Sequence, residues 1–359
     1  MLKLLTVIGA RPQFIKAATV SRAVGNRDDI TEVLVHTGQH YDADMSDIFF
    51  DELAIPRPDR HLGIGGGTHG QMTGRQLEAI EAAMIEEKPD YVLVYGDTNS
   101  TLAGALAAAK LHIPVAHVEA GLRSFNRRMP EEINRIVTDH VASLLFVPTD
   151  TAMRNLRYEG MPPEKLHHVG DVMYDAALFY RDRARKPDWF DGLQIAPGTY
   201  VLATIHRQEN TDDAARLQAI FDGLGRSDRS VILPVHPRTR TRIEANGISI
   251  PASVKCVAPV GYLEMVWLEM NSIAVATDSG GVQKEAYFHG KPCVTLRDET
   301  EWVELVETGW NTLVGADTAR INAALSDLSV PQKGASLYGE GDSAERIIEM
   351  VVASAKGGL

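Results

Sequence analysis

Short runs of β-branched and apolar residues alternate with longer amphipathic stretches along almost the whole chain. The first series covers residues 4–8, 32–36, 91–95, 115–118 and 144–147, and the second covers residues 200–204, 231–234, 254–257, 273–276 and 293–296. Strand patterns separated by helical patterns are typical of parallel sheets with crossover helices. The sequence therefore predicts an α/β fold with two Rossmann-like sheets in tandem and a cleft between them.

The alternation of strand and helix patterns is interrupted after Val169, where a helical stretch is followed by a segment rich in Pro and Gly. A chain of 359 residues is long enough for two domains, at about 150 residues for each. We expect residues 1–170 to form the first domain and residues 171–342 the second. An amphipathic stretch over residues 343–359 follows the Gly-rich tract SLYGEGD, and we expect it to pack back on the first domain.

Composition excludes several classes of protein. The formal net charge is -12 and no stretch gathers Lys and Arg into one face, so a nucleic-acid partner is not expected. Cys256 and Cys293 each lie in a strand-like run, which predicts two buried thiols and neither a disulfide framework nor a metal site. The N-terminal apolar run is interrupted by Arg11, and no later run approaches the length of a membrane span. We therefore expect a cytoplasmic protein without a membrane partner.

Charged residues follow the predicted strands of the first half, at the edge where open α/β sheets bind ligands. The segment GARPQFIK places Arg11 and Lys16 at a helix start, which suits a phosphate, although a capped helix with two solvated cations fits as well. Asp97 follows the strand at 91–95 and would point into the cleft or cap the next helix.

A second acidic group comes from the segments HVEAGLRS and MPEEINR. Glu119 follows the strand at 115–118, and Glu131 and Glu132 open a helix. Carboxyl groups in a shielded site can have separated pKa values, so that one holds a proton while another accepts one. Alternatively, Glu131 or Glu132 simply complements the helix dipole.

The second half repeats the pattern with His206 and His236 after its first two strands. A single His in a loop is usually structural, but two at matching strand ends favour a functional role. The segment TDSGGVQKEA then runs from a strand into a helix. The amides of Ser279, Gly280 and Gly281 could bind a diphosphate there, and Glu285 could bind a ribose diol.

One literal match to a dinucleotide motif is rejected. GGGTHG at residues 65–70 fits G-x-G-x-x-G but follows none of the predicted strands, so it is interpreted as a flexible loop and no NAD is implied.

Taken together, the segments GARPQFIK, TGQHYD, GDTNSTLAGALAA, HVEAGLRS, PEEINR, HRQEN, PVHPR, TDSGGVQKEA and GKPCVTLRDETE resemble, in order and spacing, those of the non-hydrolysing UDP-N-acetylglucosamine 2-epimerases. The resemblance covers nearly the whole chain. It implies a fold like that of the GT-B glycosyltransferases, no redox cofactor, and a homodimer. The implied reaction removes the proton from C2 as UDP leaves C1, and then returns UDP and a proton on the opposite face.

The resemblance also assigns roles to residues. Asp97, Glu119, Glu131 and His206 would form the catalytic group, and which carboxylate acts as the base stays open. The UDP-sugar would be bound by Arg11, Lys16 and His236 near the diphosphate, by Ser279, Gly280 and Gly281 at the phosphates, and by Glu285 at the ribose.

Departures from the family pattern concern the sugar. Where enzymes acting on UDP-N-acetylglucosamine show G-T-R-P-E-A-I-K and T-E-R-P-E, this chain has GARPQFIK and TEWVE. These variants resemble the branch acting on UDP-2,3-diacetamido-2,3-dideoxy-glucuronic acid, an intermediate for surface polysaccharides such as lipopolysaccharide O-antigen. Arg127 and Arg128 would suit the C6 carboxylate of that sugar, because a guanidinium binds a carboxylate through two parallel hydrogen bonds. The bland alternative is a solvated surface pair.

Other functions share these features. A GT-B glycosyltransferase would use the same fold and diphosphate site but would need an acceptor. A UDP-N-acetylglucosamine 2-epimerase, a hydrolysing epimerase and a catalytically silent nucleotide-sugar-binding protein are further alternatives.

Overall fold

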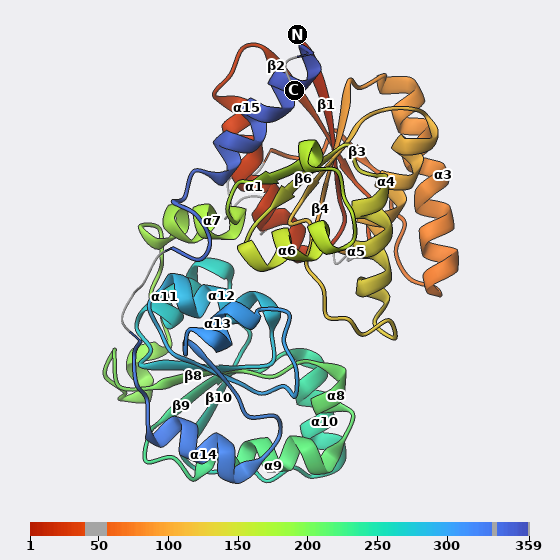
Figure 1. Cartoon of the computed structure of the whole chain (residues 1–359). Helices are drawn as coiled ribbons and strands as arrows, with labels where there is room; N and C mark the ends of the chain where they lie inside the picture. Colours follow the sequence, from red (N-terminus) through yellow and green to blue (C-terminus); the bar gives the residue numbers. More distant parts are fainter. Residues whose placement is uncertain (40–55, 332–335, 358–359) are drawn as a thin grey trace. The chain divides into compact units, whose positions relative to one another are not determined.

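The computed structural model describes residues 1–39, 56–331 and 336–357. The chain divides into two compact units (Figure 1). Unit 1 contains Met1–Ala176 and Ser336–Leu359, and unit 2 contains Ala177–Ala335. One division falls inside helix α7 (Val172–Arg181), where the sequence placed the boundary at 170, and the chain returns to unit 1 at Ser336 rather than at 343.

Unit 1 is built on a parallel seven-stranded sheet with the order β3-β2-β1-β4-β5-β6-β7. The chain winds outward from β1 to β3 and then crosses to β4 on the other side of β1. The carboxyl ends of β1 and β4 therefore flank the switch point, which is where ligands of such sheets bind. The strands are β1 (Leu2–Ile8), β2 (Ile30–His36), β3 (Arg60–His61), β4 (Tyr91–Tyr95), β5 (Val115–Val118), β6 (Leu144–Val147) and β7 (Leu166–His168).

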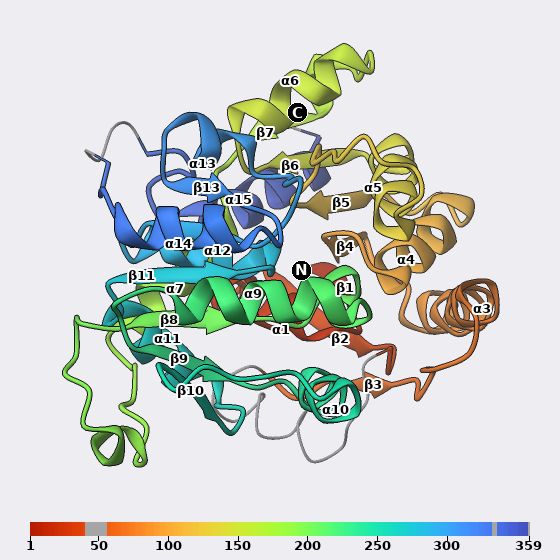
Figure 2. The same ribbon diagram turned by 90° about the horizontal axis from the view of Figure 1, so that it is seen from below.

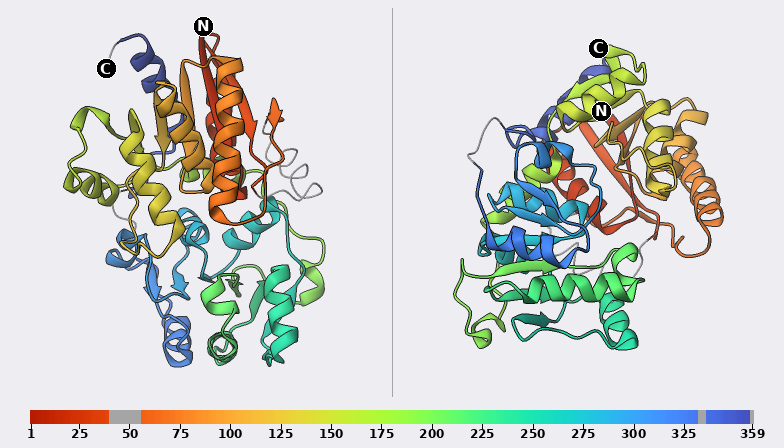
Figure 3. Two further views of the ribbon diagram at one scale, coloured as in Figure 1. Left: turned by 90° about the vertical axis from the view of Figure 1, so that its right-hand side faces the viewer. Right: turned by 60° about the horizontal axis from the view of Figure 1, so that its bottom comes forward.

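Helices cover both faces of this sheet, and β4 is buried along its whole length, as expected for a central parallel strand (Figures 1 and 3). One face carries α1 together with α15, which come from opposite ends of the chain and pack side by side. The other face carries α3, α4 and α5. The helices of unit 1 are α1 (Arg11–Gly25), α3 (His69–Glu87), α4 (Asn99–Lys110), α5 (Pro130–Val141), α6 (Asp150–Tyr158), the start of α7 and α15 (Ser343–Ala355), with a 3-10 turn η1 (Pro163–Lys165).

The C-terminal helix α15 is capped by a residue that lies far away in the sequence. Asp175 of α7 accepts a hydrogen bond from the backbone N–H of Ala344 at 2.8 Å. Burial raises the pKa of Asp175 to about 6, against the lowering effect of the amides at the start of α15. The ionised carboxylate is therefore costly even though it caps a helix.

This cap predicts a pH-dependent stability. Because the folded-state pKa of Asp175 lies above its unfolded value, its contribution is present below about pH 4 and is lost as the pH rises through about 6. Ionisation of Asp175 should lower the unfolding free energy of the parent as the pH rises from about 4.5 to about 7.5. In Asp175→Asn this decrease should be smaller by on the order of 1–3 kcal/mol, measured by urea unfolding. The exposed Asp182→Asn is the control, and an unchanged pH dependence in Asp175→Asn would contradict the assignment.

Unit 2 contains a parallel six-stranded sheet with the order β10-β9-β8-β11-β12-β13. Its switch point lies between β8 and β11. The strands are β8 (Val201–Thr204), β9 (Val231–Pro234), β10 (Val254–Val257), β11 (Ala274–Thr277), β12 (Cys293–Thr295) and β13 (Asn311–Leu313). The helices are the end of α7, α8 (Gln208–Thr211), α9 (Ala214–Gly225), α10 (Pro237–Asn246), α11 (Tyr262–Met270), α12 (Gly280–Phe288), α13 (Val303–Glu307) and α14 (Thr318–Ser326), with a 3-10 turn η2 (Phe190–Leu193).

Successive side chains of β8 point to opposite faces of the sheet, as they do along any strand, and therefore belong to two different cores. Val201 and Ala203 pack with α9, α10 and α14 on one face, and α9 and α14 lie side by side there (Figure 2). Leu202 packs with α11, α12 and the η2 turn on the other face. The α/β fold class predicted from the sequence is thus confirmed in both units.

Three details differ from the sequence predictions. The short strands β3, β7 and β13 were not predicted, because runs of two or three residues carry too little periodicity. Cys256 is exposed rather than buried, because β10 is an edge strand, whereas Cys293 is buried as expected. The loop at 65–68 follows the two-residue β3 and leads into α3, with Thr68 as N-cap. It follows an edge strand and not a central one, so its rejection as a dinucleotide site is unaffected.

The helices among the described residues include none with the length and apolar character that a membrane span requires.

Candidate active site

The turns after β1 and β4 are locked together by one buried amide. The side-chain oxygen of Gln13 accepts the backbone N–H groups of Gly9 and Ala10 at 2.8 and 3.0 Å. Its side-chain nitrogen donates to the carbonyl of Tyr95 at 2.9 Å and to Thr101. An amide is the side chain that can accept on one side and donate on the other. Gln13 therefore fixes the start of α1 relative to the end of β4.

This turn places Lys16 in the switch point rather than in solvent. Its ammonium lies 2.7 Å from Glu119, and both side chains are buried. Gly96 has a positive φ of 61°, and a Cβ there would lie 3.2 Å from the Lys16 ammonium. Glu119 itself has a φ of 70°, a strained conformation for a non-glycine residue that is frequent at functional sites. The solvated alternative for Lys16 is thus wrong, and Glu119 lies where it was predicted.

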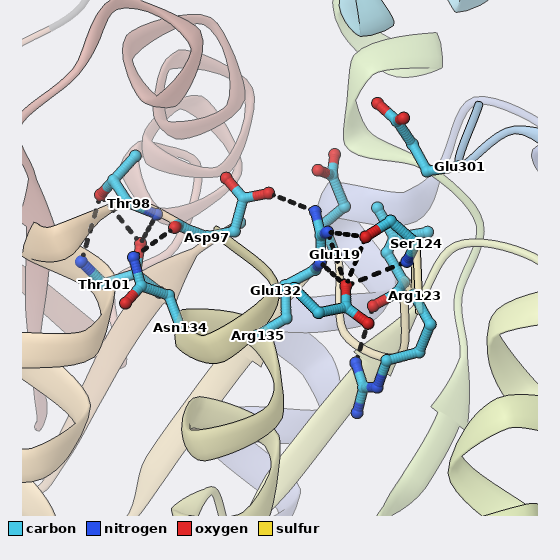
Figure 4. A network of polar contacts seen from close by, with 12 residues as sticks. Asp97, Thr98, Thr101, Glu119, Arg123, Ser124, Glu132, Asn134, Arg135 and Glu301 are labelled. Carbon is cyan, nitrogen blue, oxygen red and sulfur yellow. Dashed lines mark hydrogen bonds and ion pairs between the residues drawn. The ribbon is translucent and has the colours of Figure 1, made fainter. Parts of the chain in front are cut away.

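Asp97 pairs with a cation that the sequence reading overlooked. Arg135 of α5 donates to the Asp97 carboxylate at 2.7 Å, and Asn134 donates to its carbonyl at 2.8 Å (Figure 4). The N-cap of α4 is Thr98, so the capping interpretation of Asp97 is wrong. Burial raises the pKa of Asp97, while Arg135 and Lys16 oppose the rise and Glu119 and Glu131 add to it. The charges of Glu119 and Glu131 thus act on Asp97, as expected for three carboxylates of one group.

Glu131 and Glu132 have different environments. Glu132 is buried and accepts hydrogen bonds from Arg135 and from the backbone amides of Ser124 and Phe125 (Figure 4). Burial alone would raise the pKa of Glu132, but these donors lower it below the ordinary value. Glu131 is exposed in the first turn of α5. Glu132 therefore holds the preceding turn, and Glu131 presents a carboxylate outward near Asp97.

The turn that Glu132 holds carries the two arginines predicted to bind the sugar. Arg127 and Arg128 are both exposed, and the Arg128 amide donates to the Asn126 side chain at 3.2 Å. Phe125 precedes them with a φ of 59° and is 75% exposed. The turn is therefore fixed at its base while its charged tip projects into solvent. Arg11 begins α1, but its side chain lies outside what the structure describes.

In unit 2 the buried Asp278 organises the turn that follows β8. It accepts the backbone N–H groups of His206 and Arg207 at 3.0–3.1 Å and the side chain of Asn210 at 3.1 Å. The Nδ1 atom of His206 lies 3.3 Å from the same carboxylate. A carboxylate on one ring nitrogen orients an imidazole and directs its other nitrogen outward. His206 is thus held in a defined orientation with a partly exposed ring.

The remaining predicted residues of unit 2 lie at strand ends as expected. His236 is the N-cap of α10 and its Nδ1 accepts the amide of Arg238, which gives it a structural task. Its ring lies 6.2 Å from that of His206.

The start of α12 is where TDSGGVQKEA predicts an anion site. The hydroxyl of Ser279 caps the helix, and its own amide donates to Thr277, so that amide is not available to a phosphate. The first-turn amides of Gly280 and Gly281 have no acceptor within the helix. A Cβ at position 280 would lie 2.4 Å from a Glu301 oxygen, so a larger residue there would have to displace the Glu301 side chain.

Glu285 is buried in α12 and accepts a hydrogen bond from the Tyr262 hydroxyl at 3.3 Å. Burial raises the pKa of Glu285 to about 7. A carboxylate that binds a ribose diol must be ionised to accept two hydroxyl hydrogens. Nucleotide binding and deprotonation of Glu285 should therefore be linked.

Glu285→Gln should weaken UDP binding by about 10- to 100-fold at pH 8, because hydrogen bonds to a charged group contribute about 1.5–3 kcal/mol. The parent should bind UDP more tightly at about pH 8 than at about pH 6, and Glu285→Gln should show a smaller increase. The titration of UDP itself affects both proteins equally, so the difference reports Glu285. Calorimetric titration measures both effects, and the exposed Glu244→Gln is the control. Equal affinities of Glu285→Gln and the parent would remove Glu285 from the ribose site.

Two doubly wound units in tandem, with Lys16 at the switch point of the first and the glycine amides of α12 at that of the second, are the arrangement expected of a GT-B-like enzyme of nucleotide sugars. The sequence profile of the UDP-N-acetylglucosamine 2-epimerases matches residues 22–352. The chain belongs to this family, and it is a UDP-sugar 2-epimerase, an isomerase.

Individual relatives agree. The chain is 57% identical to the UDP-2,3-diacetamido-2,3-dideoxy-D-glucuronate 2-epimerase of Pseudomonas aeruginosa, over 97% of this chain and 99% of that protein. The UDP-GlcNAc 2-epimerase of Methanocaldococcus jannaschii, solved with UDP-GlcNAc and UDP, superimposes with a TM-score of 0.86 at 42% identity, covering 98% of this chain and 99% of that one. The Neisseria meningitidis enzyme bound to UDP-GlcNAc gives 0.86 at 30% identity, covering 98% and 100%. The predicted family and GT-B-like fold are confirmed.

Proposed function

We propose that this protein inverts C2 of UDP-2,3-diacetamido-2,3-dideoxy-glucuronic acid, giving the manno epimer without releasing UDP or free sugar. The observation that carries the proposal is the grouping of Asp97, Glu119 and Glu131 with two buried cations at the switch point of unit 1. The substrate follows from the 57% identical Pseudomonas aeruginosa enzyme, whose name states that it acts on this sugar.

The chemistry needs a base on one face of the sugar ring and an acid on the other. A carboxylate takes the C2 proton, the C2–H electrons form a C1–C2 double bond, and the C1–O bond breaks so that UDP leaves with its electron pair. UDP then adds back to C1, and C2 takes a proton on the opposite face. Asp97 has the raised pKa that suits proton transfer, and Glu119 and Glu131 are the candidates for the opposite face.

Unit 2 supplies the groups that bind the nucleotide. The amides of Gly280 and Gly281 begin α12, where the helix dipole favours phosphate, and Glu285 binds the ribose. His206, oriented by Asp278, stabilises the departing diphosphate together with His236. Neither this set nor the carboxylate set requires a metal or a redox cofactor.

The biological setting is part of the same proposal. The family resemblance implies a homodimer that works in the cytoplasm without nucleic-acid or membrane partners. The product would serve the assembly of surface polysaccharide such as lipopolysaccharide O-antigen.

The decisive experiment incubates the protein with the UDP-diacetamido-uronate alone in D₂O and follows C2 by NMR. Deuterium at C2 with a mixture of gluco and manno epimers is the expected result. Unlabelled, unchanged sugar would overturn epimerisation in favour of a transferase or a binding protein, and accumulation of free UDP would reveal a hydrolysing enzyme.

UDP-N-acetylglucosamine is the competing substrate, because two of the similar solved structures contain it. The double change Arg127→Ala with Arg128→Ala should raise KM for the uronate by about tenfold or more, since one charge-assisted contact is worth about 1.5–3 kcal/mol. The exposed Arg154→Ala serves as the control. Preference of the parent for UDP-N-acetylglucosamine would remove both arginines from the proposed site.

A further inference from the structure

A buried histidine contacts the turn that follows β4, next to the predicted catalytic carboxylates. His117 of β5 is fully buried, two residues before Glu119. Its Nδ1 lies 2.7 Å from the Asp139 carboxylate of α5, and its Nε2 lies 2.8 Å from the carbonyl oxygen of Gly96, which precedes Asp97. The ring therefore spans from α5 to the turn that carries Asp97.

Both ring nitrogens face acceptors. A backbone carbonyl can only accept, so Nε2 carries a proton. The proton at the other end belongs either to Nδ1 or to Asp139. Burial alone would raise the pKa of Asp139, but the hydrogen bonds and charges of His117 and Arg123 bring it below the ordinary value. Asp139 is thus held by both His117 and Arg123, and its hydrogen bond to Nδ1 fixes the other end of the ring.

Asp139 is held by further contacts. It also accepts the Gly121 amide at 3.1 Å and pairs with Arg123 at 2.8 Å. Arg123 in turn donates through two nitrogens to the two oxygens of Glu159, with both distances 2.7 Å. The buried Asp139 carboxylate is therefore paired, which is the condition under which buried charges are tolerated.

We propose that His117, hydrogen-bonded to Asp139, is a positioning residue for the epimerisation, fixing the Gly96–Asp97 peptide and thereby the Asp97 carboxylate. This inference rests on the proposed function. Gly96 is held from two sides, because its N–H donates to the Val118 carbonyl at 3.0 Å while its carbonyl accepts from His117. Asp139 belongs to α5, which also carries Arg135, so the His117–Asp139 contact aligns the two partners of the Asp97–Arg135 pair.

A matched pair of variants separates the two ends of the ring. The amide nitrogen of Gln can replace Nε2 and donate to Gly96, whereas that of Asn replaces Nδ1 and reaches only Asp139. In C2–deuterium exchange with the UDP-diacetamido-uronate, His117→Asn should lose about 100-fold or more in kcat. His117→Gln should retain at least about tenfold more activity than His117→Asn, and UDP affinity should be unchanged in both. Equal rates in the two variants, or a greater loss in His117→Gln, would overturn the positioning role.

The hydrogen bond to Gly96 is tested without activity. In ¹⁵N NMR of the parent protein labelled at histidine, the Nε2 atom of His117 should carry a proton, because the Gly96 carbonyl can only accept. The resonance that is missing from His117→Gln identifies His117. An Nε2 atom without a proton would overturn the hydrogen bond on which the positioning role depends. Because this readout involves no sugar, it stands or falls apart from the proposed function.

Discussion

Asp97→Asn is expected to lose C2 hydrogen exchange by about 10³-fold or more, because an asparagine has the shape of the carboxylate but cannot take a proton. The amide oxygen can still accept from Arg135, so the pair that positions the side chain is kept. Asp97 makes none of the proposed nucleotide contacts, so UDP affinity should change less than about twofold. Deuterium incorporation at C2 measures the first effect, and calorimetry with UDP measures the second.

The matched control is Asp150→Asn, an exposed aspartate in the first turn of α6 of the same unit. It should leave exchange unchanged. Full exchange by Asp97→Asn would transfer the proton-carrying role to Glu119 or Glu131, whereas equal losses of exchange and UDP affinity would indicate a folding defect.

The parent enzyme should also show the raised pKa of Asp97 in its rate profile. A base must be ionised to act, so kcat/KM should rise with pH through the Asp97 pKa. Burial raises the pKa of Asp97, so this increase in rate should occur at a higher pH than for an ordinary aspartate. Arg135 and Lys16 limit the increase in pKa. In Asp97→Asn any residual activity should lack that increase in rate.

The positions of the site residues were predictable because parallel strands end at a common edge. Asp97, Glu119, His206 and Ser279 each follow a central strand, and a strand reveals itself by an apolar run whatever packs around it. Within each unit, membership of one group then follows from the sheet topology. The same argument places Lys16 in the second turn of α1, the helix that follows β1.

The partners of these residues could not be read from such patterns. Arg135 and Asp139 lie in the interior of α5, where position along a helix does not reveal which strand end a side chain meets. His117 lies within an apolar strand, and this pattern indicates a residue of the hydrophobic core. The difference between the adjacent Glu131 and Glu132 depends on which of them faces the turn at Ser124, and this is a property of the packed helix.

Arg135→Met should be the most destabilising single change in unit 1 discussed here, costing about 3–5 kcal/mol, because it leaves a buried carboxylate without its cation. Arg135 donates to Asp97 at 2.7 Å and to Glu132 at 2.7 Å. Glu132 is 1% exposed and cannot turn to water, whereas methionine keeps much of the apolar stem of arginine. Arg135→Lys should recover little, because a single ammonium does not reproduce the planar fork that reaches two carboxylates.

A second substitution identifies the cause of the loss. Glu132→Gln removes the stranded charge but keeps an oxygen for the amides of Ser124 and Phe125. The double variant Arg135→Met with Glu132→Gln should therefore regain more than half of the lost stability, a coupling of about 1.5 kcal/mol or more in a double-mutant cycle.

The chain provides its own control for this measurement. All four tryptophans, Trp189, Trp267, Trp302 and Trp310, belong to unit 2. In urea unfolding the transition seen by far-UV circular dichroism should therefore move for Arg135→Met, while the midpoint of tryptophan fluorescence should stay with that of the parent. A joint shift of both signals, or a double variant no more stable than Arg135→Met, would show that the loss does not come from the charge left on Glu132.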